Sequence, residues 1–287
     1  MVNLTKNLNY LNLAGYVLNT FVTFFASPIF HLADISQQSA SYQTLITPAA
    51  YAFSIWGIIF TTQGIFAAVQ MHPAFRNLEI IQDGVKYWYF ITCVMQSLWV
   101  FIALGTHQFI LSTLVMIGIL ISLVNIVENQ RKIHASVSTK EYWLFQFPFE
   151  IHCGWIYAAS AITLNMCGIR MGAGAEMQFG MAILTMAGLV MIIFRYLERT
   201  PRPNYTIPLV LAWAAYGIFQ ELGDPKHLIV ETFSRMEIFV FRILARMFCV
   251  GSLLGVMMSV IRNRGMEEAW RLGHRGEQVG LLGNMTI

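Results

Sequence analysis

Charged residues are scarce in this sequence. Only 11% of its 287 residues are Asp, Glu, Lys or Arg, whereas a soluble domain carries about 25%. In their place stand 56% hydrophobic residues and a mean hydropathy of +0.58. The alternation of apolar and polar residues that marks a membrane β-barrel is also lacking. These features point away from a water-soluble domain and predict an all-α, polytopic membrane protein.

Chemistry-bearing motifs are lacking as well. The chain has four cysteines and no C-x-x-C, so we expect small packing residues rather than a disulfide framework or a metal site. No H-E-x-x-H, G-x-S-x-G, P-loop or G-x-G-x-x-G pattern occurs, and nothing indicates nucleophilic or phosphoryl chemistry. We therefore predict no enzyme activity and no covalently held cofactor. The net charge of +3 reflects topology rather than a nucleic-acid partner.

What the sequence does contain is apolar segments about 20 residues long, the length that crosses a bilayer core. Eight are found: Tyr10–Phe30, Pro48–Val69, Tyr87–Gly105, Gln108–Val127, Trp143–Asn165, Met177–Phe194, Tyr205–Gln220 and Ile238–Ile261. Lys and Arg concentrate in the loops on one side of such an eight-span arrangement. By the positive-inside rule both termini are expected inside.

The second segment begins "ITPAAYAFSIWGIIF", in which polar and apolar parts join at Pro48. Phe53, Trp56, Phe60 and Gly64 follow at helical spacing and share one face. Such a stripe serves either helix packing, where glycine admits a neighbour, or a ligand groove, and periodicity alone favours packing. A polar loop, residues 31–47, precedes it and is long enough to be functional.

The fifth segment carries a carboxylate, Glu150, which needs a partner inside a membrane. Arg242 and Arg246 in the last segment are the available partners, and we expect a buried ion pair that fixes helix docking, with Arg246 nearer in depth than Arg242. A proton-handling or ligand-anchoring role is the alternative. Pro148 is expected to kink this helix. His152 faces another side than Glu150, so a joint metal site is not expected.

Three stretches in order resemble the TspO/translocator-protein family, the tryptophan-rich sensory proteins. They are "ITPAAYAFSIWGIIF", "MQSLWVFIAL" and "PFEIHCGWIYAASAITLN". The resemblance covers about Leu11 to Asn165, although Gln96 stands where the family has Asn and one proline ahead of the second helix is missing. It implies a five-helix bundle with a pocket between helices, capped by the first loop.

The expected organisation is a five-helix bundle over residues 1–167, three additional helices over 168–262, and an inside-facing polar tail over 263–287. The resemblance implies a bound tetrapyrrole (porphyrin), sterol or phospholipid, held without covalent chemistry. A flat apolar ligand would stack on aromatic rings, and Asn165 or Glu150 could orient its polar edge. The ligand-binding residues expected are Pro48, Phe53, Trp56, Phe60, Trp99, Trp155, Ala158 and Asn165.

Two other functions remain open at this point. The chain could be an accessory subunit of a large membrane complex, respiratory or photosynthetic, which the added helices and the Gly251-x-x-x-Gly255 pattern suit. That pattern equally suits a homodimer or packing within the bundle. A proton-coupled transporter built on Glu150 and Arg246 is the third hypothesis. The expected location is a multi-pass position in an organelle membrane such as that of the mitochondrion.

Overall fold

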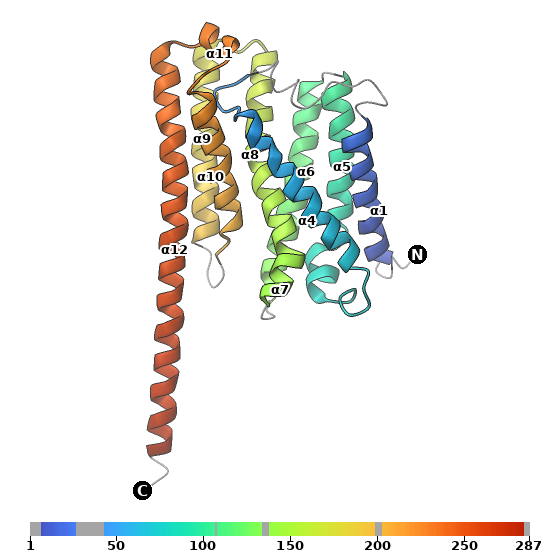
Figure 1. The fold of residues 1–287 in the computed structure, drawn as a ribbon, viewed down its shortest axis with the longest axis vertical. Helices are drawn as coiled ribbons and strands as arrows, with labels where there is room; N and C mark the ends of the chain where they lie inside the picture. The colour runs from blue at the N-terminus through green and yellow to red at the C-terminus, as the bar shows by residue number, and fades with distance from the viewer. Residues whose placement is uncertain (1–6, 27–42, 107, 134–137, 199–202, 284–287) are drawn as a thin grey trace.

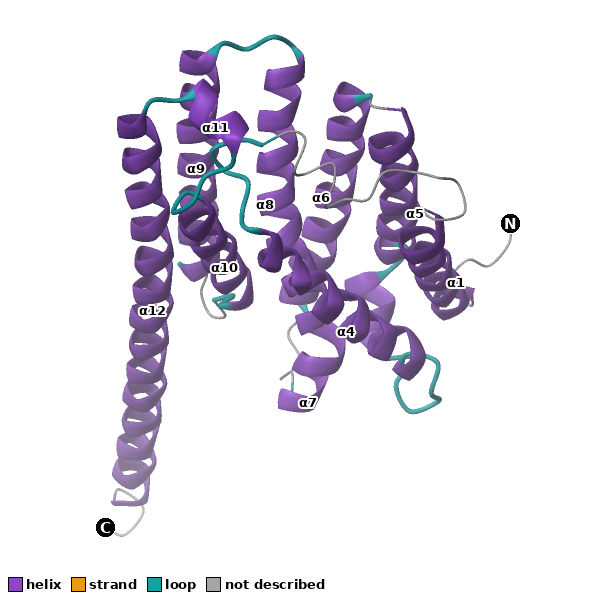
Figure 2. Cartoon of the chain, turned by 45° about the horizontal axis from the view of Figure 1, so that its top comes forward, coloured by secondary structure: helices purple, strands orange, loops and turns teal. Residues whose placement is uncertain are grey.

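The computed structural model describes residues 7–26, 43–106, 108–133, 138–198 and 203–283, and for 265–283 only the path of the backbone. Every regular element in this part of the chain is helical (Figure 2). In chain order they are α1 (Leu8–Phe21), η2 (Val22–Ala26), η3 (Ala50–Ser54), α4 (Ile55–Val69), η4 (Ile80–Val85), α5 (Trp88–Phe101), η5 (Ile102–Thr106), α6 (Phe109–Lys132), α7 (Thr139–Glu141), η6 (Tyr142–Gln146), α8 (Phe147–Arg170), α9 (Ala175–Leu197), α10 (Thr206–Glu221), α11 (His227–Thr232) and α12 (Arg235–Gly283). The η elements are single turns of π or 3₁₀ helix.

Each of the eight predicted segments contains a helix, and the all-helical prediction is confirmed for the described residues. Four helical stretches there are long and apolar enough to cross a membrane: Ala50–Val69, Phe109–Lys132, Ala175–Leu197 and Arg235–Arg264. Helix α8 is long enough, but its tryptophan, tyrosine and polar residues lower its hydropathy. Such a helix suits the interior of a bundle, where protein rather than lipid surrounds it.

Helix α8 lies at the centre of the molecule. Figure 1 shows it between α6 on one side and the group α9, α10 and α12 on the other, while α4 crosses the bundle obliquely (Figures 1 and 2). Pro148 stands in the first turn of α8, directly after the π-helical turn η6, so the helical segment departs from regular α-helix next to the proline where the kink was predicted. The buried apolar residues form one contiguous cluster from Leu45 to Phe248. The last helices therefore share their core with the first five.

Glycine brings α10 close to two other elements. A Cβ on Gly154 of α8 would lie 2.8 Å from Val210 Cβ, and one on Gly217 of α10 would lie 2.8 Å from Pro48 Cβ. Two hydrogen bonds strengthen the second contact: Ala49 N donates to the Gly217 carbonyl (3.0 Å), and Trp213 Nε1 donates to the Ala52 carbonyl (3.0 Å). Helix α10 thus holds the start of the second predicted segment in place.

Helix α12 caps the end of α9. The carbonyl of Leu197, in the last turn of α9, has no partner within its own helix. It accepts hydrogen bonds from Ser259 Oγ and Arg262 Nη2, both at 3.1 Å. Gly255 allows this approach, because a Cβ there would lie 3.0 Å from Leu197 Cδ1, whereas Gly251 meets no atom within 4 Å. The glycine pattern thus serves packing at Gly255, and Gly251 faces open space.

Candidate functional site

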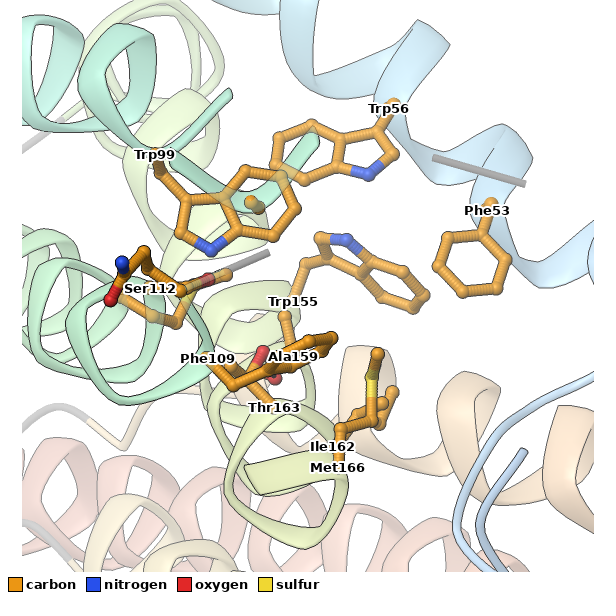
Figure 3. A pocket seen from close by; sticks show the side chains of 13 residues that line it. Phe53, Trp56, Trp99, Phe109, Ser112, Trp155, Ala159, Ile162, Thr163 and Met166 are labelled. Atoms are coloured by element: carbon orange, nitrogen blue, oxygen red, sulfur yellow. Dashed lines mark hydrogen bonds between the residues drawn. The ribbon is translucent and has the colours of Figure 1, made fainter. Parts of the chain in front are cut away.

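Two neighbouring cavities lie between α4, α5, α6 and α8. The larger has a volume of about 280 Å³ and the smaller about 70 Å³. They share four lining side chains, Phe53, Trp56, Trp99 and Met116. We call them together the cavity pair. Figure 3 shows the smaller cavity, into which rings from separate helices converge.

Several of the rings that line the cavity pair meet edge to face. Trp155 lies with its ring centroid 5.4 Å from Phe53 and 6.4 Å from Trp56, at interplanar angles of 83° and 82°. Phe24 meets Phe60 in the same manner at 5.0 Å. Edge-to-face pairs are favourable for aromatic rings but leave ring faces uncovered. At this place the rings do not fill the space between the helices, and a hollow with aromatic walls remains.

Two polar atoms of the lining side chains have no hydrogen-bond partner among the described residues. They are Nε1 of Trp99, a donor, and Oε1 of Gln96, an acceptor. Both residues are on α5 one helical turn apart, and Gln96 is only 4% exposed. Buried polar atoms are nearly always paired, by protein, water or ligand. One donor and one acceptor are therefore left without a partner within an otherwise apolar region.

A second polar cluster lies behind Trp56. His152 Nδ1 is 2.8 Å from Gln63 Nε2, and Tyr89 OH donates to Gln63 Oε1 at 3.5 Å. The His152 ring meets Trp56 edge to face at 5.6 Å. Within the described residues no group of three or more His, Cys, Asp or Glu is placed to hold a metal ion. His152 packs against Trp56 and so helps to hold this part of the aromatic wall in place.

The structure brings six of the eight predicted ligand-binding residues to the cavity pair. Phe53, Trp56 and Trp99 line both cavities, Trp155 lines the smaller one, and Pro48 and Phe60 line the larger one. Ala158 and Asn165 lie elsewhere. Ala158 packs beside α10, and Asn165 Nδ2 donates to the Ala161 carbonyl (3.0 Å) and to Thr185 Oγ1 of α9 (3.1 Å). The fifth predicted segment therefore presents two faces, and these two residues belong to the packing face.

The stripe of aromatic and glycine residues on α4 has different neighbours at different turns of the helix. Near the start of α4, Trp56 and Phe60 line cavities. One turn later Gly64 receives Tyr16 of α1, since a Cβ there would lie 2.5 Å from the Tyr16 hydroxyl oxygen. That hydroxyl donates to the Phe60 carbonyl at 3.1 Å. Both interpretations of the stripe apply, each to a different turn.

The expected ion pair between Glu150 and Arg246 or Arg242 was wrong. Glu150 Oε2 accepts a hydrogen bond from Tyr142 OH (3.0 Å), which also lies 2.6 Å from Thr206 Oγ1. Arg242 and Arg246 instead lie over the ring of Phe219, at 4.8 and 5.8 Å from its centroid.

The two sites are at opposite ends of α10. Thr206 begins this 16-residue helix and Phe219 is near its end, and a helix of that length measures about 24 Å. Glu150 is in the first turn of α8, whereas α12 begins at the other end of the bundle (Figure 1). Depth along the bundle therefore keeps the carboxylate and the guanidinium groups apart.

Several lining residues were not anticipated. On α8 they follow Trp155 at helical spacing, so the periodicity could have found them: Ala159, Ile162, Thr163 and Met166. On α6 they are Phe109, Ser112 and Met116, which also share a face. Thr23, Phe24 and Lys226 line the larger cavity from elements distant in sequence. The local sequence pattern could not predict these three residues, because only the tertiary fold brings them to the larger cavity.

The predicted capping loop lies largely outside the described residues, which resume at Gln43. Residues 43–47 are buried, and the Thr44 backbone N–H donates to Thr47 Oγ1 at 3.0 Å. They lead directly into Pro48 and the cavity wall.

Comparison with known proteins gives one match. A family model described as TSPO-like protein matches residues 9–263. No curated protein and no solved structure matches the chain. The matched region includes α9, α10 and α12 up to residue 263, so it extends well beyond the stretch from Leu11 to Asn165.

Proposed function

The chain belongs to the TSPO-like protein family, and from this premise we propose that it binds a flat hydrophobic ligand, a tetrapyrrole or a sterol-like lipid, in the cavity pair. Binding or transfer of the ligand, without covalent chemistry, is the function. The observation that carries the proposal is the aromatic wall made by Phe53, Trp56 and Trp99, which borders both cavities.

The dimensions of the cavity pair support this proposal. Ligand pockets measure about 300–1,000 Å³ and combine apolar walls with a few polar groups. The larger cavity, of about 280 Å³, approaches that range, and the smaller one adjoins it. Trp99 Nε1 and Gln96 Oε1 supply the polar groups. A planar ring system can cover the exposed ring faces while an oxygen or nitrogen atom at its edge meets these two atoms.

The membrane arrangement is part of the proposal. We place all eight long helices across the bilayer with both termini inside, because Lys and Arg then concentrate on one side. Among the helices that fail the length or hydropathy requirement, α8 and α10 are largely buried among the others. An organelle membrane, mitochondrial for example, remains the expected location.

Titration of the detergent-purified protein with protoporphyrin IX tests the proposal. We expect saturable quenching of tryptophan fluorescence. Trp99→Phe keeps an aromatic ring but removes the unpaired N–H, so it should raise the Kd about twofold to tenfold, the value of one hydrogen bond. Trp143→Phe is the matched control, since Trp143 is 55% exposed and lines neither cavity. Quenching that never saturates, or that equals quenching in empty micelles, would remove the proposal.

One observation favours a second function, that of an accessory subunit in a larger membrane complex. Helix α12 has 49 residues and measures about 74 Å, more than twice a hydrocarbon core of about 30 Å. Figure 1 shows it projecting far beyond the other helices. A helix extended in this way suits contact with another subunit or with a second copy of the chain. If the protein migrates only at the size of one bundle on native gels after mild extraction, this alternative fails.

The transporter hypothesis depended on Glu150 and Arg246 meeting. Glu150 accepts a hydrogen bond from Tyr142 and Arg246 lies over the Phe219 ring, so the ion pair on which that hypothesis depended does not form.

A further inference from the structure

One charged residue borders the cavity pair. Among the described residues that line the two cavities, Lys226 alone carries a charge, and it lines the larger cavity. It comes from the connection between α10 and α11, within the C-terminal helices. Since the rest of the described lining is aromatic, aliphatic, thioether, hydroxyl or amide, this ammonium group is the one formal charge in it.

The position of Lys226 is at the boundary between cavity and surface. Its side chain is 44% exposed although it lines the cavity, and its Nζ lies 3.2 Å from Oε1 of Glu221, whose side chain is 11% exposed. Lysine snorkels in this manner, with an apolar stem along the protein and a charged head toward water.

The contact with Glu221 leaves hydrogen-bonding capacity unused. An ammonium group has three donor protons; the 3.2 Å contact with Glu221 Oε1 is an ion-pair distance, and that oxygen has no hydrogen-bond partner among the described residues. Because the Lys226 side chain is 44% exposed, a second carboxylate can approach the ammonium group from its open side and accept from a remaining donor proton while the contact with Glu221 is kept. Arg242 is engaged elsewhere: its Nε donates to the Phe219 carbonyl at 3.4 Å and its guanidinium lies over the Phe219 ring.

We propose that Lys226 selects ligands in which a flat apolar body carries a carboxylate at one end. The body occupies the space beside Trp56 and Trp99, and the carboxylate lies near the opening, where Lys226 donates a charge-assisted hydrogen bond to it. This inference rests on the proposed function and narrows its ligand class to acids. Lys226 is a specificity-determining residue that the C-terminal helices add to the cavity.

The test compares two probes that differ only at the acid: protoporphyrin IX and its dimethyl ester. Both are titrated into the full-length protein and into Lys226→Gln, with tryptophan quenching as the readout. We expect Lys226→Gln to raise the Kd of the acid about threefold to fivefold, as for a partly exposed ion pair. The Kd of the ester should change by less than about twofold.

Two further variants define the effect. Glu221→Gln removes the competing carboxylate with little change of shape, and we expect it to tighten binding of the acid about twofold to threefold while leaving the ester unchanged. Arg235→Gln is the control, because Arg235 is an exposed cation at the start of α12 that does not line the larger cavity. It should leave both Kd values unchanged.

An unchanged Kd of the acid in Lys226→Gln would overturn the inference while leaving the proposed function intact. Equal weakening of acid and ester would also overturn it, since that result marks a structural role. If neither porphyrin saturates the unsubstituted protein, the proposed function fails, and the role of Lys226 fails with it.

Discussion

Helix α8 has one face against α10 and another against the cavity pair, and the two faces are packed differently. On the α10 face Gly154 admits Val210 so closely that a Cβ would lie 2.8 Å from it, and Ala158 and Ala161 border a space of only about 10 Å³. On the other face Trp155 lines a cavity of about 70 Å³ that adjoins the larger one. One helix thus has a closed interface and a hollow one.

The difference follows from the shapes of the side chains. Small residues let two helix backbones approach until van der Waals contact is complete, which is the usual basis of helix association in membranes. On the cavity face the large rings of Trp155, Trp56 and Trp99 stand between the helices, and the space that they border is not filled by neighbouring side chains. The closed interface therefore fixes α8, and the hollow interface is available for a ligand.

The largest effect is expected from breaking the closed interface. Gly154→Leu forces a side chain into Val210, and a Cβ there would already lie 3.3 Å from the Ile207 backbone. We expect a loss of more than about 3 kcal/mol in the free energy of unfolding, or failure to fold. Thermal unfolding in detergent and the yield of monodisperse protein measure it.

Gly180→Leu on α9 is the matched control, since a Cβ there meets no atom within 4 Å. It should unfold within a few degrees of the unsubstituted protein. Equal loss of stability in both variants would show that leucine is harmful at any glycine, not that the α8–α10 interface is tightly closed.

A second prediction fills the hollow face. Ala159 lines the smaller cavity (Figure 3), and Ala159→Leu places its added carbons there. We expect the free energy of unfolding to change by less than about 1 kcal/mol, because space is available. Protoporphyrin binding should weaken about tenfold, since the added side chain competes with the ligand. Normal binding with reduced stability would mean that the cavity is not the ligand site.

The smallest effect is expected from a single hydrogen bond on the closed side. Thr185→Val removes the Oγ1 that accepts from Asn165 Nδ2 at 3.1 Å. Asn165 keeps its second bond, to the Ala161 carbonyl. We expect a loss of about 0.5–1.5 kcal/mol in stability and no change in porphyrin affinity. A change in affinity would place Asn165 in the ligand site after all.

Much of the fold could be predicted from the pattern of apolar residues. All eight predicted segments contain a helix, because hydrophobic length and helical period are local properties. The aromatic residues of the site were found in the same way, since Trp56 and Phe60 share a face of one helix. Within α8 the prediction assigned both Trp155 and Ala158 to the ligand site. In the structure Trp155 lines the smaller cavity and Ala158 packs beside α10, and their shared apolar segment did not separate these two faces.

The partner of Glu150 could not be predicted by the same means. Composition offered only two arginines in the last segment as counter-charges, whereas a hydroxyl group suffices: Tyr142 and Thr206 lie at the correct depth. Depth depends on where each helix begins relative to its neighbours, which a single sequence does not show.

By itself, the sequence determined that this protein is a helical membrane protein of the TSPO-like family, with an aromatic stripe entering the second long helix. Hydropathy and helical spacing are properties of residues close together in the chain, so they can be determined without a structure. The tertiary structure decided that α10 holds Pro48, that Lys226 reaches the larger cavity, and that Glu150 has a hydroxyl partner. These contacts join residues far apart in the chain, and only the packing of complete helices brings such residues together.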